Sequence, residues 1–391
     1  MFQNPVERRH TDCAKWDELI DNTGEEDVIS LTVADMDFRV APEIMRAVIA
    51  AANHGIYGYT NVSERYMDLT QRWIQKHYNW MPEREWMVYC PRIINALCQI
   101  IQNYTNPGDA ILITTPLYDP IQSAIRLNDR KIVSTSLVRE ANRYEMDFED
   151  FEKKLQSGVK VFIAVSPHNP TGRVWTSEEV QKMVRLCKEN NVLIVADEIH
   201  ADFIWEGAFT SFGQFLDEYD QMFIGTSASK TFNIPGIEAA SLVIKNQALR
   251  EKFAHCLRSA GFHNPNYFCN PAVEAAYGEG EEWLALVKKA IKENRKFALA
   301  FIDQECSPCK TIPGEGTFLL WVDYSQLGIA EEAWKDTLLH EGKVACSMGG
   351  DFGEEGRGFF RINLAQPPVM FKEALTRIKK CVEGTRKWKK E

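Results

Sequence analysis

The segment "QMFIGTSASKTFNIPG", residues 221–236, places a single lysine just after an apolar run. The run 221–225 has the composition of a buried strand, and Lys230 follows it among serine and threonine residues. Lysine is usually exposed, whereas ligands of open α/β sheets bind beyond the carboxyl ends of the strands. A primary amine in that place predicts a lysine that forms a Schiff base with a carbonyl compound. An ordinary surface lysine is the alternative.

Other apolar, β-rich runs precede and follow this segment. We expect strands at 109–116, 131–137, 159–166, 191–198, 221–229 and 240–245. Amphipathic patterns lie between several of them, such as 176–190, a helix that we expect Ser177 to cap. Apolar strands that alternate with amphipathic helices predict an α/β fold with a mostly parallel sheet covered on both faces.

The last third of the chain has a different pattern. It predicts a long helix (about 271–304), a strand (317–323), a helix (about 330–340), a strand (358–365) and a final helix (about 368–383). A chain of 391 residues is long enough for two domains. We expect a large domain, 46–275, and a smaller α+β domain built from 1–45 and 276–391.

Composition narrows the class of protein. The chain is 45% hydrophobic and 26% charged, and its net charge of -10 argues against nucleic acid as a partner. The basic cluster 386–390 is expected to be a solvated helix end. No apolar run is long enough for a membrane span, and no signal peptide is expected at the start. Ten scattered cysteines without disulfide spacing favour a cytoplasmic location.

Three further motifs suit one cofactor. Asp197 ends the apolar run "VLIVAD", and a buried carboxylate needs a cationic partner such as a protonated pyridine nitrogen, unless it is a helix cap. Asn169 of "PHNPTG" offers an amide to a phenolic oxygen, with an Asx turn as the alternative. Ser227 and Ser229 have the spacing to meet one phosphate. With Lys230, these groups match the needs of pyridoxal phosphate (PLP).

Several longer motifs carry a family resemblance. They are "TDCAKWD" (11–17), "VADMDF" (33–38), "YGYT" (57–60), "SPHNPTGRVWT" (166–176), "ADEIHADF" (196–203), "SASKTFNIPG" (227–236), "GEGTFLLWVD" (314–323) and "GFFRINLA" (358–365). In this order they resemble fold-type I PLP enzymes of the class I/II aminotransferase group. Within that group the chain looks like the MalY/PatB cystathionine β-lyase (C–S lyase) subfamily, and the likeness covers nearly the whole chain.

The resemblance implies a role for each matching residue. Lys230 would hold PLP and then act as the acid and base at the substrate α-carbon. Asp197 would pair with the pyridine nitrogen. Asn169 and His200 would lie near the phenolic oxygen. Tyr118 would stack on the ring, and together with Lys230 and Asp197 it is expected to be a catalytic residue. A structural histidine and a core tyrosine are the alternatives for His200 and Tyr118.

The resemblance also implies the remaining binding groups. Phosphate would meet Ser227, Ser229, backbone amides at Ile93 and Ile94, and Tyr59 of a second subunit, so the active unit would be a homodimer with shared active sites. The amino-acid substrate would meet Arg361 at its carboxylate, with Ala34, Asp35, Tyr59 and Asn169 nearby. No metal is implied.

Two positions depart from the usual aminotransferase pattern. Arg92 and Ile93 stand where a glycine-containing turn is expected, which puts the local phosphate contacts in question unless Arg92 supplies charge. Glu238 stands eight residues after the lysine, where many aminotransferases have a phosphate-binding arginine. That gap is usual in the lyase branch.

The predicted catalytic residues are compatible with two reactions. A leaving group on the β-carbon leads to elimination, with pyruvate, ammonia and a thiol as products, and its absence leads to transamination. We expect a β-lyase acting on cystathionine or related cysteine S-conjugates, because of the subfamily resemblance, the nearby Trp16 and Phe38, and the lack of a second carboxylate-binding arginine. An aminotransferase is the first alternative, and a regulatory protein-binding role beside catalysis is the second.

Overall fold

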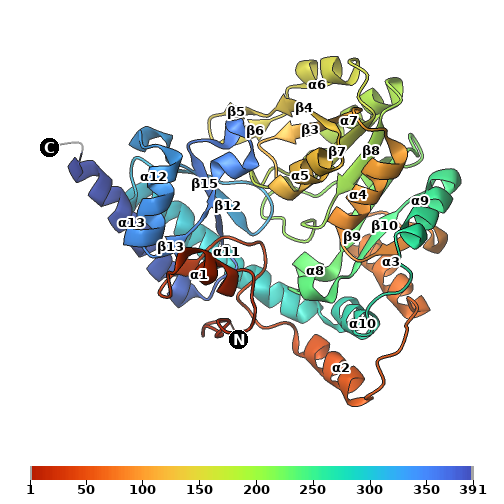
Figure 1. The fold of residues 1–391 in the computed structure, drawn as a ribbon, viewed down its shortest axis with the longest axis horizontal. Coiled ribbons are helices and arrows are strands. Elements are labelled where there is room, and N and C mark those ends of the chain that lie inside the picture. Colours follow the sequence, from red (N-terminus) through yellow and green to blue (C-terminus); the bar gives the residue numbers. More distant parts are fainter. Residues whose placement is uncertain (1, 389–391) are drawn as a thin grey trace.

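A computed structural model describes residues 2–388, so the last two residues of the basic cluster 386–390 lie outside it. Its main feature is a seven-stranded sheet at the centre of the larger part of the molecule (Figure 1). The strands, in spatial order, are β2 (Met87–Cys90), β10 (Ala240–Val243), β9 (Met222–Ser227), β8 (Leu193–Asp197), β7 (Val161–Val165), β3 (Ala110–Thr115) and β4 (Lys131–Ser136). Only β10 runs against the others, which confirms the predicted mostly parallel sheet.

Helices cover both faces of this sheet because successive strand residues point to opposite sides. Ile111 and Ile113 of β3 belong to one apolar core, whereas Leu112 belongs to the other. The first core includes side chains of α4 (Ile93–Tyr104), α5 (Asp119–Leu127) and α9 (Gln247–Ser259). The second includes side chains of α3 (Glu64–Tyr78), α6 (Phe148–Leu155), α7 (Ser177–Glu189) and α10 (Cys269–Glu279). The hairpin β5 (Val138–Glu140) and β6 (Arg143–Glu145) follows β4.

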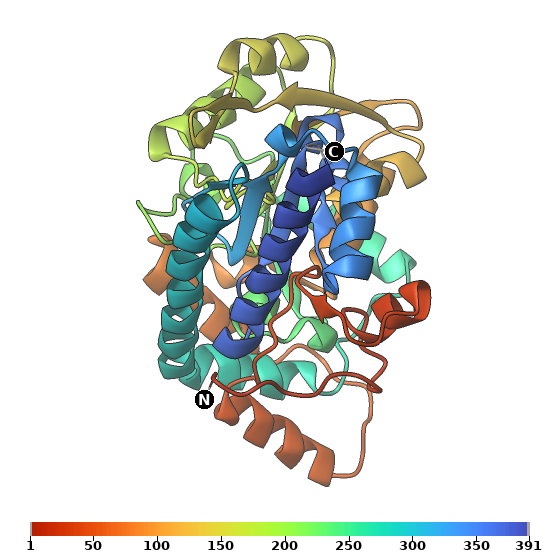
Figure 2. The same ribbon diagram turned by 90° about the vertical axis from the view of Figure 1, so that its left-hand side faces the viewer.

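The smaller part is built on a four-stranded antiparallel sheet. Its order is β11 (Lys310–Ile312), β12 (Leu319–Asp323), β15 (Phe359–Asn363) and β14 (Ser347–Met348). The long helices α11 (Glu281–Glu305) and α13 (Pro368–Trp388) pack side by side along it (Figure 2). A further helix, α12 (Glu331–Asp336), continues into a π-helical turn, Thr337–Glu341.

The amino-terminal segment joins this smaller part. After α1 (Asp17–Thr23), the short strand β1 (Ile29–Ser30) pairs in parallel with β13 (Val344–Ala345). The chain then passes through residues 32–38 to α2 (Pro42–Asn53), which lies at the edge of the molecule (Figure 1). Residues 32–38 therefore lead from the smaller part of the molecule to α2.

Local expectations needed three corrections. The predicted helix 271–304 is two helices, α10 and α11, which meet at Gly280, where the aromatic ring of Phe232 leaves no room for a side chain. The N-cap of α7 is Thr176 instead of Ser177, because Thr176 and Glu179 form a reciprocal capping box. Strand β2 was not predicted at all. In the described residues, no helix combines the length and apolarity that a membrane crossing requires.

Candidate active site

Polar side chains gather where the parallel strands end. Asp197 is the last residue of β8, and it pairs with Val165, the last residue of β7, and with Gly225 of β9. Asn169 follows β7 by four residues, and Lys230 follows β9 by three. Because these strands are parallel, their carboxyl ends open at the same edge of the sheet. The register therefore brings three sequence motifs that lie far apart along the chain to one place.

Lys230 lies on the short helix α8 (Ala228–Thr231), directly after β9. Its Nζ donates a hydrogen bond to the carbonyl oxygen of Ala34, 2.7 Å away. Burial is the main reason that its pKa falls to about 8; the charge of Arg361 adds to the fall, whereas Asp35 and Asp197 oppose it. A lysine with that pKa has a neutral fraction of about a tenth at pH 7, enough for it to act as a nucleophile or base.

Asp197 is buried, with 8% of its surface exposed. Its Oδ1 accepts a hydrogen bond from the amide of Ile199 at 3.2 Å, so the cap contact considered from the sequence exists. It forms no ion pair within residues 2–388. Burial raises its pKa to about 6, against the opposing effects of the Ile199 amide and of Lys230. One amide hydrogen bond does not offset the cost of burying a charged carboxylate, so Asp197 still lacks the cationic partner that it needs.

Arg361 is equally short of charge partners. It lies in the middle of β15, opposite Trp321 of β12 and Ser347 of β14. Its guanidinium donates to three neutral oxygens: Asn169 Oδ1 at 2.9 Å, Ser347 Oγ at 3.1 Å and the carbonyl of Thr32 at 3.2 Å. Burial lowers its pKa to about 10, and its buried Nε has no hydrogen-bond partner among the described residues. A bidentate carboxylate ligand would supply both the missing acceptor and the missing charge.

His200 and Tyr118 lie near the same charged residues, and the group formed by Lys230, Asp197, Asn169, Arg361 and these two residues is called the cleft below. Burial, then the charges of Lys230 and Arg361, hold the pKa of His200 well below its usual value, so its ring is neutral. Its buried Nδ1 has no hydrogen-bond partner in the described part of the chain. Burial raises the pKa of Tyr118, and the charges of Arg361 and Asp197 also act on it. Both residues therefore lie close enough to sense the charged groups of the cleft.

The residues predicted to bind phosphate lie at the starts of α8 and α4, and the Ser227 hydroxyl is already engaged within the chain. Ser227 caps α8 by accepting a hydrogen bond from the Ser229 amide at 3.0 Å, and its hydroxyl donates to the carbonyl of Ala239 at 2.6 Å. Ile93 is the first residue of α4 and Ile94 the second, so their amides lie in the unpaired first turn of that helix. The Ile93 side chain touches the position that a Cβ of Gly225 would take, so the start of α4 borders β9.

The two departures from the usual pattern form a pair. Arg92 is the N-cap residue of α4, and its guanidinium lies 2.6 Å from Glu238. Its positive charge is therefore balanced by Glu238, so Arg92 adds little net charge for an anion in the cleft. Tyr59 differs from the other predicted residues because it is fully exposed on its own chain.

Comparison with known proteins agrees with this geometry. The profile described as "Aminotransferase class I and II" matches residues 26–378. The chain belongs to the class I and II aminotransferase family. The Bacillus subtilis (strain 168) protein "Cystathionine beta-lyase PatB" is 34% identical over 381 residues, which is 97% of this chain and 98% of the relative. "Protein MalY" of Escherichia coli (strain K12) is 29% identical over 98% of this chain and 99% of its own length.

Solved structures of this aminotransferase family are similar over the full chain. Cystalysin from Treponema denticola, which contains pyridoxal 5'-phosphate, superposes with a TM-score of 0.95 at 31% identity and covers 98% of this chain and 99% of its own. The PLP-bound C–S lyase from Staphylococcus hominis gives a TM-score of 0.92 at 30% identity and covers 98% of both chains. The predicted family and fold class are thus confirmed.

Sequence reasoning missed several residues that shape the cleft. Ser347 and Thr32 bind Arg361, and the ring of Phe352 lies 5.0 Å from its guanidinium carbon. Ser347 faces Arg361 only through the pairing of β14 with β15, and no local motif signals that pairing. Trp16, which we expected near the pocket, instead donates its indole N–H to Asp37 at 3.0 Å. That contact belongs to a separate group of charges beside the cleft.

Proposed function

We propose that this protein is a PLP-dependent carbon–sulfur β-lyase that cleaves cystathionine or related cysteine S-conjugates. One molecule of substrate and one of water give a thiol, pyruvate and ammonia. The observation that carries the proposal is the site where Lys230, Asp197 and Arg361 lie together with no ion-pair partner among the described residues, with Asp197 and Arg361 buried and Lys230 partly buried. This cleft occurs in a chain that matches a cystathionine β-lyase over 97% of its length.

The donor set fits PLP. Asp197 would hold the pyridine nitrogen, since its buried carboxylate lacks the cation that it needs. The hydroxyl of Ser229, the cap residue Ser227 and the amides at Ile93 and Ile94 would hold the phosphate. Asn169 and His200 would lie at the phenolic oxygen, and Tyr118 would cover the ring. When bound, PLP supplies an electron-withdrawing ring that stabilises negative charge at the substrate α-carbon.

Lys230 and Arg361 would act on the substrate itself. Arg361 holds the α-carboxylate through its planar fork and fixes the α-carbon beside Lys230. Lys230 takes the α-proton, for which its lowered pKa of about 8 is well suited at neutral pH. The backbone of Ala34 and Asp35 borders this position, since the Ala34 carbonyl already binds Lys230 Nζ. Loss of the thiolate from the β-carbon follows.

Transamination is the competing outcome. It would use Lys230, Asp197 and Arg361 in the same way, and the family profile bears the aminotransferase name. The relative at 34% identity favours elimination because it is named a cystathionine β-lyase, and the similar solved structures include a C–S lyase. Lyase activity is therefore the main proposal.

The active unit in this proposal is a homodimer. Ile56 and Tyr57 are exposed by 68% and 59%, and Tyr59 is fully exposed, so an apolar stretch after α2 lies uncovered on the single chain. Exposed apolar groups that lie together mark contact surfaces. Tyr59 would enter the phosphate site of the second copy, which would explain its exposure here. Sedimentation at equilibrium should give twice the chain mass. We retain the cytoplasm as the proposed location, from the cysteine content.

A product assay tests the reaction directly. Protein loaded with PLP is incubated with cystathionine and, separately, with an S-alkyl cysteine, with no keto acid added, and both thiol and pyruvate are followed. β-Elimination predicts that they appear in equal amounts. If neither appears, and amino-group exchange begins once a keto acid is supplied, the protein is an aminotransferase.

A further inference from the structure

Residues 32–38, here called the connecting loop, are held by side chains of the cleft. Lys230 and Asn233, which follow β9, donate hydrogen bonds to carbonyl oxygens of this loop. Arg361 and Asn363 of β15 donate to others, at 2.6–3.2 Å. The connecting loop thus receives donors from both sheets, and two of these donors are the residues proposed to handle the substrate.

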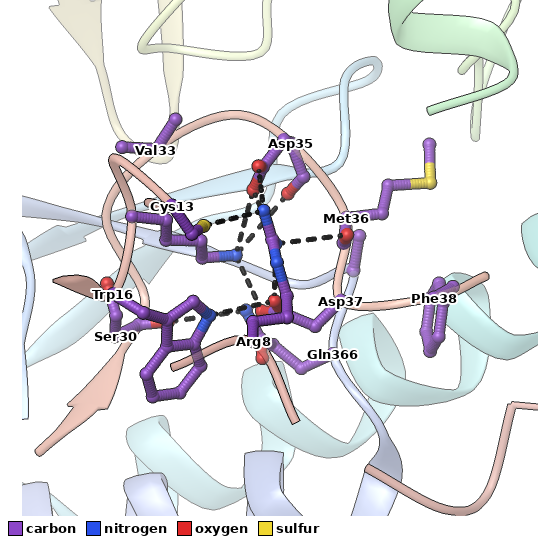
Figure 3. A network of polar contacts seen from close by, with 12 residues as sticks. Arg8, Cys13, Trp16, Ser30, Val33, Asp35, Met36, Asp37, Phe38 and Gln366 are labelled. Carbon is purple, nitrogen blue, oxygen red and sulfur yellow. Dashed lines mark hydrogen bonds and ion pairs between the residues drawn. The ribbon is translucent and has the colours of Figure 1, made fainter. Parts of the chain in front are cut away.

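Four charged residues meet beside the loop, and Figure 3 shows Arg8 close to Asp35 and Asp37. Arg8 contacts Asp35 and Asp37 at 2.6 Å each. Lys15 contacts Asp37 at 2.7 Å and Asp35 at 3.4 Å. Two cations from the amino-terminal segment therefore meet two carboxylates of the connecting loop, and the four charges sum to zero. We call these four residues the charge cluster.

The charge cluster is buried at Lys15 and Asp37 and partly exposed at Arg8 and Asp35. Lys15 and Asp37 are exposed by only 1% and 2%. Trp16 donates its indole N–H to Asp37, and the Asp37 amide donates to the carbonyl of Ala365 at 3.0 Å. Buried ion pairs add little net stability, since desolvation offsets most of their attraction. Their geometry is nevertheless demanding, so such a group is better suited to fixing a backbone segment in one position.

The cluster also reaches Lys230 electrostatically. The charged or titratable groups that face Lys230 are Asp35 of the connecting loop, Asp197 at the end of β8, Arg361 of β15, Lys15 of the amino-terminal segment and the neutral His200. Two of these five groups belong to the charge cluster. A change in the cluster should therefore alter both the position of the Ala34 carbonyl and the field at Nζ.

We propose that Lys15 and Arg8 are positioning residues of this active site. They hold the connecting loop in one position and balance the charge of its two carboxylates. The carbonyl oxygens of the loop then keep the side chains of Lys230 and Arg361 in the positions that catalysis requires. The proposal rests on the function assigned to these two residues above. It also assigns a role to the motif "TDCAKWD", which contains Lys15.

Hydrogen exchange tests the placement without using catalysis. The amide of Met36 is bound by Asn233 Oδ1 at 2.9 Å, and that of Asp37 by Ala365. In Lys15→Met, we expect both amides to exchange at least about tenfold faster than in the parent. The control is Lys379→Met, which removes a lysine paired with Glu305 at 2.7 Å on the surface and should leave both rates unchanged. Parental rates in Lys15→Met would overturn the proposal, whatever reaction the protein catalyses.

A spectroscopic titration tests the effect on Lys230. Loss of the Lys15 charge favours protonation at Lys230, so the pH midpoint of the visible absorbance band of PLP-loaded protein should rise by about half a unit or more. Lys379→Met should keep the parental midpoint. A folded Lys15→Met protein with an unchanged midpoint and an unchanged KM for cystathionine would contradict the proposal.

Two further variants cover the case in which Lys15→Met does not fold. Lys15→Met with Asp37→Asn leaves one cation and one anion, which should restore folding while the midpoint stays raised. Arg8→Gln changes the more accessible cation, with a side chain 22% exposed, and should raise the midpoint in the same direction. If both variants fold and keep the pH midpoint of the parent, the charge cluster only stabilises the fold, and the proposal is overturned.

Discussion

The cleft and the charge cluster both contact the connecting loop, but their charges are paired differently. In the cluster, each ion has an oppositely charged partner within 3.4 Å, and the sum is zero. In the cleft, Lys230, Asp197 and Arg361 have only neutral hydrogen-bond partners, and all three have shifted pKa values. Paired charges hold the fold in place, and unpaired ones mark where ligands complete the structure.

The largest expected effect comes from Lys230→Ala. It should lower kcat/KM by at least about 1000-fold, because the group that moves the α-proton is lost. The visible absorbance band of the PLP-loaded protein should disappear with it. Lys288→Ala is the matched control, since Lys288 is also a partly buried lysine with a lowered pKa but lies outside the cleft, bound to the Asp202 carbonyl. If Lys288→Ala lost as much kcat/KM as Lys230→Ala, lysines of the cleft would be no more important for catalysis than a lysine elsewhere in the core.

Asp37→Asn should unfold more easily than the parent by about 3 kcal/mol, because it leaves the buried Lys15 and the partly exposed Arg8 with one carboxylate. The cations Lys15 and Arg8 hold the pKa of Asp37 below its usual value, against burial. A lowered pKa means that this stability is complete at neutral pH and is lost as the pH falls through the folded-state value. Urea unfolding at pH 7 measures the difference. A loss below about 1 kcal/mol, the size of a surface pair, would show that the cluster is weakly coupled.

Arg361→Ala should raise KM for amino-acid substrates by about 100-fold, as expected for the loss of two charge-assisted hydrogen bonds. Arg361→Lys keeps the charge but loses the planar fork, so its KM should lie between those of Arg361→Ala and the parent. Steady-state kinetics with cystathionine and with an S-alkyl cysteine checks this. An unchanged KM for both substrates in Arg361→Ala would place the carboxylate site elsewhere.

When PLP is absent, Asp197→Asn should raise the free energy of unfolding, whereas Asp37→Asn should lower it. Burial raises the pKa of Asp197 from 3.8 to about 6, so the folded protein binds the proton more tightly than the unfolded chain. The resulting penalty is absent below about pH 4, grows up to about pH 6 and is full at pH 7. The variant should therefore be more stable by up to about 3 kcal/mol at pH 7.

Unfolding of the PLP-free Asp197→Asn protein at pH 7 and at pH 4 checks this sign. The gain should vanish at the lower pH. Reduced stability at pH 7 would mean that the charged carboxylate is needed as the cap of the Ile199 amide, which is the structural alternative for this residue.

The cleft was predictable from the sequence because its residues follow strands whose patterns are strong. Asp197 ends an apolar strand, and Lys230 and Asn169 follow such strands by three and four residues; parallel strands bring these positions together without further information. Their roles toward PLP remain predictions, as do the domain boundaries. The break at Gly280 was not visible, since it depends on the ring of Phe232, which arrives from another part of the chain.

The charge cluster was not predictable for a related reason. Arg8 and Lys15 lie 20 to 29 residues from Asp35 and Asp37, and charged residues in an amino-terminal segment are usually solvated. Their pairing depends on how the connecting loop runs between the two sheets. The strand β1, only two residues long, anchors that path by pairing with β13. Such contacts arise from tertiary structure and leave no local pattern.

The most direct test of the account is to locate PLP on the chain. The loaded protein is reduced with borohydride, digested, and searched by mass spectrometry for the lysine that carries the cofactor. The account predicts one modified peptide, with the added mass on Lys230 and none on the paired Lys15 or on Lys288. Modification of another lysine, with Lys230 untouched, would contradict the claim that the unpaired charges of the cleft form the active site.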